Sequence, residues 1–209
     1  MQDKAHIAIG TLLFTEKLEL VNWDEYKRLV ADAYDKAPEY DERAVPAYQA
    51  MLSACDRFFK MIGSKVKVEF VDGDPYTSQQ QMKQEVAATK VLKVMKDFSD
   101  HPLFTKEQNW KFRAVHDWFT HILTNQPFTL EGELKAYNTH LKMFPPASYP
   151  ALFTEIVGQV CYQTSHGSFP TQKVCVLDGF DYKNLGHVEG HTIQNKQLMR
   201  NDASTNATG

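Results

Sequence analysis

The stretch TKEQNWKFRAVHDWFTHIL, residues 105–123, sets the fold class of this 209-residue chain. It opens on a capping box, because Thr105 and Gln108 stand three residues apart and can satisfy each other's backbone N–H groups. Apolar side chains then recur every three or four residues, the spacing of one helix face: Phe112, Val115, Phe119 and Ile122. A long helix is therefore expected from Thr105 to about Leu123.

Two further helices are expected directly downstream. Asn125-Gln126-Pro127 breaks the first helix, and Thr129 can cap a second one that Pro145-Pro146 stops. A third begins at Ser148-Tyr149-Pro150 and runs to about Tyr162. This third helix is apolar almost all round and contains no basic residue, which is typical of a buried helix.

The residues upstream predict two more long helices. One is capped at Asn22 and ends before Pro38, and the next starts near Glu42 with Pro46 in its first turn. The second of these carries an apolar stripe that favours packing against the protein's own core over a partner-binding seam.

Between the upstream and central helices, the pattern changes to that of a small β element. Residues 65–71 alternate strictly between apolar and charged side chains, as in a half-buried strand. Ser78 can cap a short helix to about Thr89, and a second short strand is expected at Val91–Met95. We therefore expect a mainly α fold, a helical bundle-like single domain with a small two- or three-stranded β element. The domain is expected over residues 1–195, and the polar residues 196–209 are expected to form a disordered tail.

Composition excludes several classes of protein. Hydrophobic residues make up 43% and charged residues 23%, so the chain is neither disordered throughout nor a coiled-coil rod. A net charge of −3 gives no global cationic field, which disfavours nucleic acid as a partner. Three cysteines argue against a disulfide scaffold and for a reducing compartment. There is no apolar run of about 18 residues to span a membrane and no secretory signal pattern, so a protein that is not secreted is expected.

The three central helices carry polar side chains that an amphipathic helix does not require. Asp117 and His121 are four residues apart and are expected to share a face. Glu155 lies on the apolar third helix, where an unpaired carboxylate costs several kcal/mol, so either a cation, a donor or a metal is expected beside it or its carboxyl keeps its proton. The complete set is Arg113, His116, Asp117, His121, Glu133, His140, Glu155 and Gln159.

Imidazoles and carboxylates from several helices are a usual way to hold a transition metal inside a helical protein. The metal ligands predicted from this set are His116, His121, His140 and Glu155, for a divalent ion such as zinc, iron or manganese. Asp117 and Glu133 are predicted as a further ligand or the general base, and Arg113 and Gln159 as groups that orient or neutralise a substrate. The corresponding function is a metal-dependent hydrolase acting on a phosphoester, nucleotide or amide.

Two other interpretations stay open. The same histidines and acids can form a purely structural polar network, as in a non-enzymatic accessory protein, and the strong HExxH metal motif is absent. A host-directed factor that binds a protein or DNA is the third, although the acidic balance disfavours DNA. The sequence leaves the oligomeric state open.

Several short motifs together resemble a domain that recurs in bacteriophage proteins, alone in small proteins and within very large multi-domain polypeptides. Thr120 departs from the commoner glycine before the last histidine of the first motif, and both residues are small. The resemblance implies a phage origin, a location in the host cytoplasm or the virion, and a polar site carried on helices; it implies no particular activity. The motifs are Phe112-Arg113-Ala114-Val115-His116-Asp117 with His121, Gly132-Glu133 with Ala136, Tyr137 and His140, Thr154-Glu155 with Gly158-Gln159, Gln172-Lys173, Asp74-Pro75-Tyr76 and His101-Pro102-Leu103.

Overall fold

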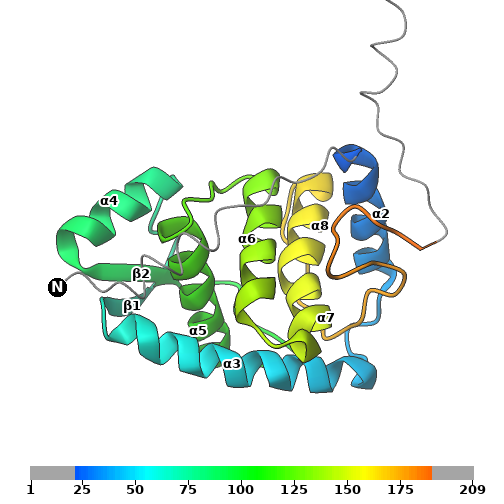
Figure 1. Ribbon diagram of the computed structural model, residues 1–209, viewed down its shortest axis with the longest axis horizontal. Helices are drawn as coiled ribbons and strands as arrows, with labels where there is room; N and C mark the ends of the chain where they lie inside the picture. Colours follow the sequence, from blue (N-terminus) through cyan, green and yellow to red (C-terminus); the bar gives the residue numbers. More distant parts are fainter. Residues whose placement is uncertain (1–21, 190–209) are drawn as a thin grey trace, which may run out of the picture.

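The computed structural model of the chain describes residues 22–189, which form a mainly helical fold (Figure 1). The predicted fold class is confirmed, whereas the predicted domain boundary at residue 195 and the tail at 196–209 lie outside the described residues. The α-helices are α2 (Trp23–Lys36), α3 (Val45–Gly63), α4 (Gln79–Thr89), α5 (Lys106–His116), α6 (Leu130–Met143), α7 (Tyr149–Leu152) and α8 (Gln159–His166). The remaining elements are the strands β1 (Lys67–Val71) and β2 (Val91–Met95), the 3-10 turns η1 (Glu42–Ala44) and η3 (Pro146–Ser148), and the π-helical segments η2 (Asp117–Ile122) and η4 (Phe153–Gly158).

Helix starts follow the capping residues read from the sequence. The side chain of Thr105 accepts from Gln108 N, and that of Gln108 accepts from Thr105 N, which completes the predicted capping box. Asn22, Ser78 and Thr129 likewise accept a backbone N–H two or three residues into their helices. These caps satisfy donors that the first turn of a helix otherwise leaves unpaired, so the boundaries were predictable from local chemistry.

The β element is a two-stranded parallel sheet. Lys67 pairs with Val91 and Val71 with Met95, and α4 forms the crossover between the two strands. Leu92 and Val94 of β2 are buried, while β1 is at most half-buried. The prediction of a second strand at Val91–Met95 is confirmed, and the first strand starts at Lys67, two residues later than the alternation suggested.

The helices share one core. In Figure 1, α3 runs along the base of the molecule, with α6 and α8 side by side above it and α2 beyond α8. Their inner faces contribute large, fully buried side chains, among them Tyr26, Tyr34, Tyr48, Tyr137 and Phe153. The described helices include none that is long and apolar enough to cross a membrane.

The two long central helices differ from the prediction in one respect. Each was expected as a continuous α-helix, but a π-helical segment follows α5 and another follows α7. A π turn closes through a hydrogen bond from residue i+5 to residue i, as Leu123 N donates to Trp118 O at 3.0 Å. Such turns are frequent at functional sites, and both of these carry predicted site residues.

Candidate metal centre

The predicted site residues do not converge on one point. The first group, on η2 and α6 and at the end of α5, holds His116, His121, Glu133 and His140. The second group surrounds Glu155 and Gln159, where η4 meets α8. Arg113 binds backbone elsewhere, so the two groups have to be considered separately.

Three side chains of the first group direct potential ligand atoms at one another. His116 Nε2 lies 3.0 Å from His121 Nε2 and 3.1 Å from Glu133 Oε2, and His121 Nε2 lies 3.4 Å from Glu133 Oε1. Ligands about 2.0–2.1 Å from a tetrahedral zinc ion are about 3.3 Å apart, which is close to these separations. The three residues therefore form a group that can hold a metal ion.

The π turn explains why His116 and His121 meet. In an α-helix, residues five apart point about 140° away from each other, whereas a π turn brings them nearly above one another. The sequence-based expectation placed Asp117 and His121 on one face, and the charges of these two residues do interact. It did not bring His121 to His116, because it assumed α-helical spacing. The segment η2 instead pairs His121 with His116, with the two rings 4.8 Å apart between centroids.

The second nitrogen of each ring is also engaged. His121 Nδ1 lies 2.7 Å from the carbonyl oxygen of Gln126, which can only accept, so Nδ1 carries the hydrogen. In the neutral ring, Nε2 of His121 then presents its lone pair toward Glu133. His116 Nδ1 lies 3.2 Å from Nε2 of His140. Partners of this kind fix the tautomer and ring orientation of metal-binding histidines.

His140 does not occupy the position of a metal ligand that the sequence predicts for it. Its Nε2 faces Nδ1 of His116, on the side of that ring opposite the nitrogen that meets His121 and Glu133. The ring is fully buried, and Nδ1 has no hydrogen-bond partner among the residues that the structure describes. Burial, together with the nearby His116, lowers the pKa of His140 well below its ordinary value and keeps the ring neutral.

The charges of this group are strongly coupled. Burial alone would raise the pKa of Glu133, but His116 and His121 hold it far below its ordinary value. Burial opposes protonation of His121, yet the carboxylate of Glu133 raises its pKa above the ordinary value. About a sixth of the His116 and Glu133 side chains is exposed, at 16% and 18%, against 2% for His121, so the group has contact with solvent.

Asp117 lies beside this group without belonging to it. Burial raises the pKa of its carboxyl, while His121 and His116 act in the opposite direction, which shows that their charges lie nearby. Asp117 is not among the three residues whose potential ligand atoms cluster, which are His116, His121 and Glu133. A carboxylate with a raised pKa is a better proton acceptor, so the predicted role of general base fits Asp117 better than that of ligand.

Neighbouring elements hold η2 and its following loop in place. The buried side chain of Gln79, at the start of α4, donates from Nε2 to the carbonyl oxygen of His121 at 2.6 Å. Gly132, in the first turn of α6, lets the carbonyl of Pro127 approach so closely that a Cβ would stand 2.0 Å from it. This contact fixes the loop that presents the Gln126 carbonyl to His121. Neither Gln79 nor Gln126 lies on a recognisable motif, so their roles were not predictable from the sequence.

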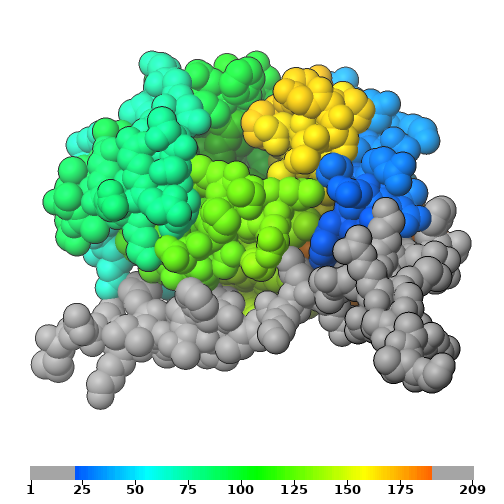
Figure 2. Space-filling model, turned by 90° about the horizontal axis from the view of Figure 1, so that it is seen from above, coloured from blue at the N-terminus to red at the C-terminus, as the bar shows by residue number. Residues whose placement is uncertain are grey.

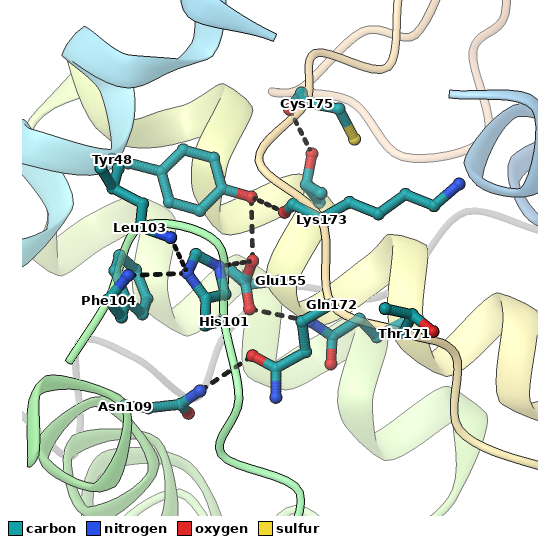
Figure 3. A network of polar contacts seen from close by, with 12 residues as sticks. Tyr48, His101, Leu103, Phe104, Asn109, Glu155, Thr171, Gln172, Lys173 and Cys175 are labelled. Carbon is teal, nitrogen blue, oxygen red and sulfur yellow. Dashed lines mark hydrogen bonds and ion pairs between the residues drawn. The ribbon is translucent and has the colours of Figure 1, made fainter. Parts of the chain in front are cut away.

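The second group is a buried polar network around Glu155 (Figure 3). Glu155 Oε1 lies 2.8 Å from the Tyr48 hydroxyl and 3.3 Å from His101 Nε2, and Oε2 accepts from Gln159 Nε2 at 2.7 Å. His101 Nδ1 accepts two backbone N–H groups, from Leu103 and the next residue, so its hydrogen is on Nε2 and points at Glu155.

Two predictions are therefore corrected. Glu155 is not part of the histidine group, because hydrogen-bonding groups of α3, of the loop before α5 and of α8 already surround its carboxylate. Gln159 is bonded to Glu155, so its amide serves this network. His101 was not among the predicted site residues, although the motif His101-Pro102-Leu103 contributes to the phage-domain resemblance and was the available signal.

Arg113 also differs from its predicted role. Its guanidinium donates to three backbone carbonyls at the end of β2 and just after it, those of Met95, Asp97 and Phe98, at 2.6–3.1 Å. Burial lowers the pKa of Arg113 from its usual high value, against the attraction of Asp117 and Glu155. Arg113 therefore anchors the loop after β2 and is not placed to neutralise a substrate.

The three cysteines form no disulfide among the residues that the structure describes. Cys55, Cys161 and Cys175 are free and buried. Burial raises the pKa of the Cys161 thiol to about 12, so it is protonated at neutral pH and is a poor nucleophile.

Figure 2 shows the molecule from above, where a hollow is bordered by the yellow-green α6, the yellow α8 and the green segment that includes α5. The potential ligands lie on two of these elements and on η2, which continues α5.

Comparisons of this chain with protein-family models, with curated proteins and with solved structures find no match. No similar protein indicates a role, so the function is inferred from the arrangement of the site residues alone.

Proposed function

We propose that this chain is a divalent-metal protein with hydrolytic activity, and that His116, His121 and Glu133 hold the metal. The observation that carries the proposal is the convergence of three residues from η2, α5 and α6, whose potential ligand atoms lie 3.0–3.4 Å apart: Nε2 of His116 and of His121 and the two carboxylate oxygens of Glu133. A hydrogen-bonded second nitrogen on each imidazole supports it further.

The donor set indicates which metals fit. Two imidazoles and one carboxylate suit catalytic zinc and also iron(II) or manganese. Three protein ligands leave at least one coordination position for water or substrate, so a bound ion would supply Lewis acidity and activate water. Asp117, with its raised pKa and its place beside the histidines, would accept the proton that the attacking water loses. The proposed substrates are compounds with a phosphoester, nucleotide or amide bond, as the sequence analysis predicts.

Metal analysis of the full-length chain tests this proposal. We expect protein purified without chelator to contain a divalent metal, or to take up one equivalent of zinc or cobalt(II) after chelator treatment. His121→Ala and Glu133→Gln should each abolish or strongly weaken uptake. The matched controls are His166→Ala and Glu131→Gln, two exposed residues of α8 and α6, which should bind as the wild type does.

Hydrolysis is tested separately, with phosphoester, nucleotide and amide model substrates and with zinc, iron(II) or manganese added. Activity should depend on added metal and disappear in Glu133→Gln. If the wild-type chain binds no metal under any of these conditions, the proposal is wrong. If it binds metal but hydrolyses none of the substrates, the metal centre stands and the hydrolase assignment fails.

A second candidate function is that of a non-enzymatic phage accessory or virion-associated protein. The Glu155 network favours it, because one carboxylate joins α3, η4, α8 and the loop before α5 in a purely structural arrangement. The resemblance to a recurring phage domain supports the phage origin. This candidate predicts that the chain copurifies with phage particles and that substitutions in both polar groups affect stability alone.

A further inference from the structure

We infer that His140 is a positioning residue that sets the tautomer of His116 and so makes Nε2 of His116 available to a metal. His140 Nε2 lies 3.2 Å from His116 Nδ1, while His116 Nε2 faces His121 and Glu133. His140 thus acts on the centre through His116, without contact with the metal. This inference rests on the proposed metal centre and assigns a new role within it.

The hydrogen count of the two rings gives the mechanism. A neutral imidazole carries one ring hydrogen, so the contact between His140 and His116 exists in two forms. When His140 Nε2 donates, His116 accepts at Nδ1 and carries its own hydrogen on Nε2, which blocks a metal. When His116 Nδ1 donates instead, its Nε2 presents a lone pair toward His121 and Glu133. Metal binding therefore requires His140 to accept at Nε2.

The surroundings of His140 make the second form, in which His140 accepts at Nε2, unfavourable in the metal-free protein. The ring packs between Phe112 and Phe144, with centroids 6.2 and 5.3 Å away, and is fully buried. In the metal-ready form, the hydrogen of His140 is on Nδ1, which has no acceptor among residues 22–189. A buried donor without a partner is unfavourable, so the metal-free protein favours the blocked form and a bound metal reverses the preference. The two tautomers are thus coupled to metal binding.

Three variants of the full-length chain separate this role from packing. His140→Leu removes the acceptor at similar volume, whereas His140→Gln places an amide oxygen near the position of Nε2. Leu134→Ala, a nearly fully buried change on the same helix, is the control for lost stability alone. Each protein is stripped with chelator, its folding is verified by circular dichroism, and it is titrated with cobalt(II) while the visible absorption is recorded.

We expect His140→Leu to weaken cobalt(II) binding about 10- to 100-fold, the usual effect of losing a partner of a metal-binding histidine. His140→Gln should restore most of the affinity and the wild-type cobalt spectrum, and Leu134→Ala should keep both. A purely structural His140 would leave the affinity of His140→Leu unchanged, which refutes the inference. A direct ligand would give equal losses in both His140 variants with an altered spectrum, which also refutes it.

The failure of this inference is distinguishable from the failure of the proposed function. If the wild-type chain takes up no metal, both are wrong. If the wild-type chain binds cobalt(II) and His140→Leu binds it equally well, the metal centre stands and only the role of His140 is overturned.

Discussion

The substitution Gly132→Ala tests how the backbone of α6 orients the proposed metal centre from a distance. Gly132 touches no ligand, but a Cβ at this position would stand 2.0 Å from the carbonyl oxygen of Pro127. The adjacent Gln126 carbonyl accepts from His121 Nδ1 at 2.7 Å. Relief of the clash should therefore move the carbonyl that fixes the His121 ring.

The size of the effect follows from the same distances. Real Cβ contacts essentially never fall below 3.0 Å, so the loop and the helix must separate by at least about 1 Å. Such overpacking typically costs about 1–3 kcal/mol, against a gain of about 1 kcal/mol for alanine over glycine within a helix. A net loss of stability of about 0–2 kcal/mol is expected. Metal affinity should fall by about 10-fold or more, because the partner of His121 is displaced.

Two measurements on one protein check this reasoning. Urea unfolding of the metal-free chain gives the stability change, and zinc titration gives the affinity change. Gly63→Ala is the matched control, since nothing lies within 4 Å of a Cβ built there. If Gly132→Ala binds zinc as tightly as the control does, the Gln126 carbonyl does not orient His121 and this account of the site is wrong.

The remaining predictions separate the two polar groups. Glu155→Ala should cost about 1–3 kcal/mol in urea unfolding, because it removes the acceptor of the buried His101 Nε2 and of Gln159 Nε2, and zinc affinity should change little. Arg113→Ala should lower the free energy of unfolding by about 1.5–3 kcal/mol, because its partners are backbone carbonyls, and zinc affinity should again change little. In the metal-free chain, stability from the raised pKa of His121 should be complete below about pH 6.5 and be lost as pH rises through the folded-state value. Stability from the lowered pKa of Glu133 should be present above about pH 4.3 and be lost as pH falls, so Glu133→Gln should flatten the unfolding profile at both ends. A profile unchanged in Glu133→Gln would contradict this coupling.

The sequence was sufficient for the features that depend on neighbouring residues. The capping box at Thr105, the stop at Pro38 and the second strand at Val91–Met95 all follow from local hydrogen bonding or alternation, and the structure confirms them. Fold class follows from the same signals, because apolar side chains at helical spacing predict which faces are buried.

The composition of the site could be predicted only in part. Glu155 was correctly expected to need a partner inside an apolar helix, but only Gln159 lies near it in sequence, and its other two partners are residues 48 and 101, far away in the chain. Spacing within one helix carries no information about which distant loop reaches it. The division of the predicted set into a network around Glu155 and a proposed metal group therefore required the tertiary structure.

The choice of partners within the metal group shows the physical limit of sequence periodicity. An α-helical repeat places residues 117 and 121 together, and it turns 116 and 121 apart. The π-helical hydrogen bond from Leu123 N to Trp118 O changes the second relation and brings His116 and His121 together. The Gln79 amide and the close packing of Gly132 on Pro127 hold this segment and the loop after it in place. Because the same turn brings His116 and His121 within 3.0 Å, the departure from the α-helix and the proposed metal centre are one structural feature.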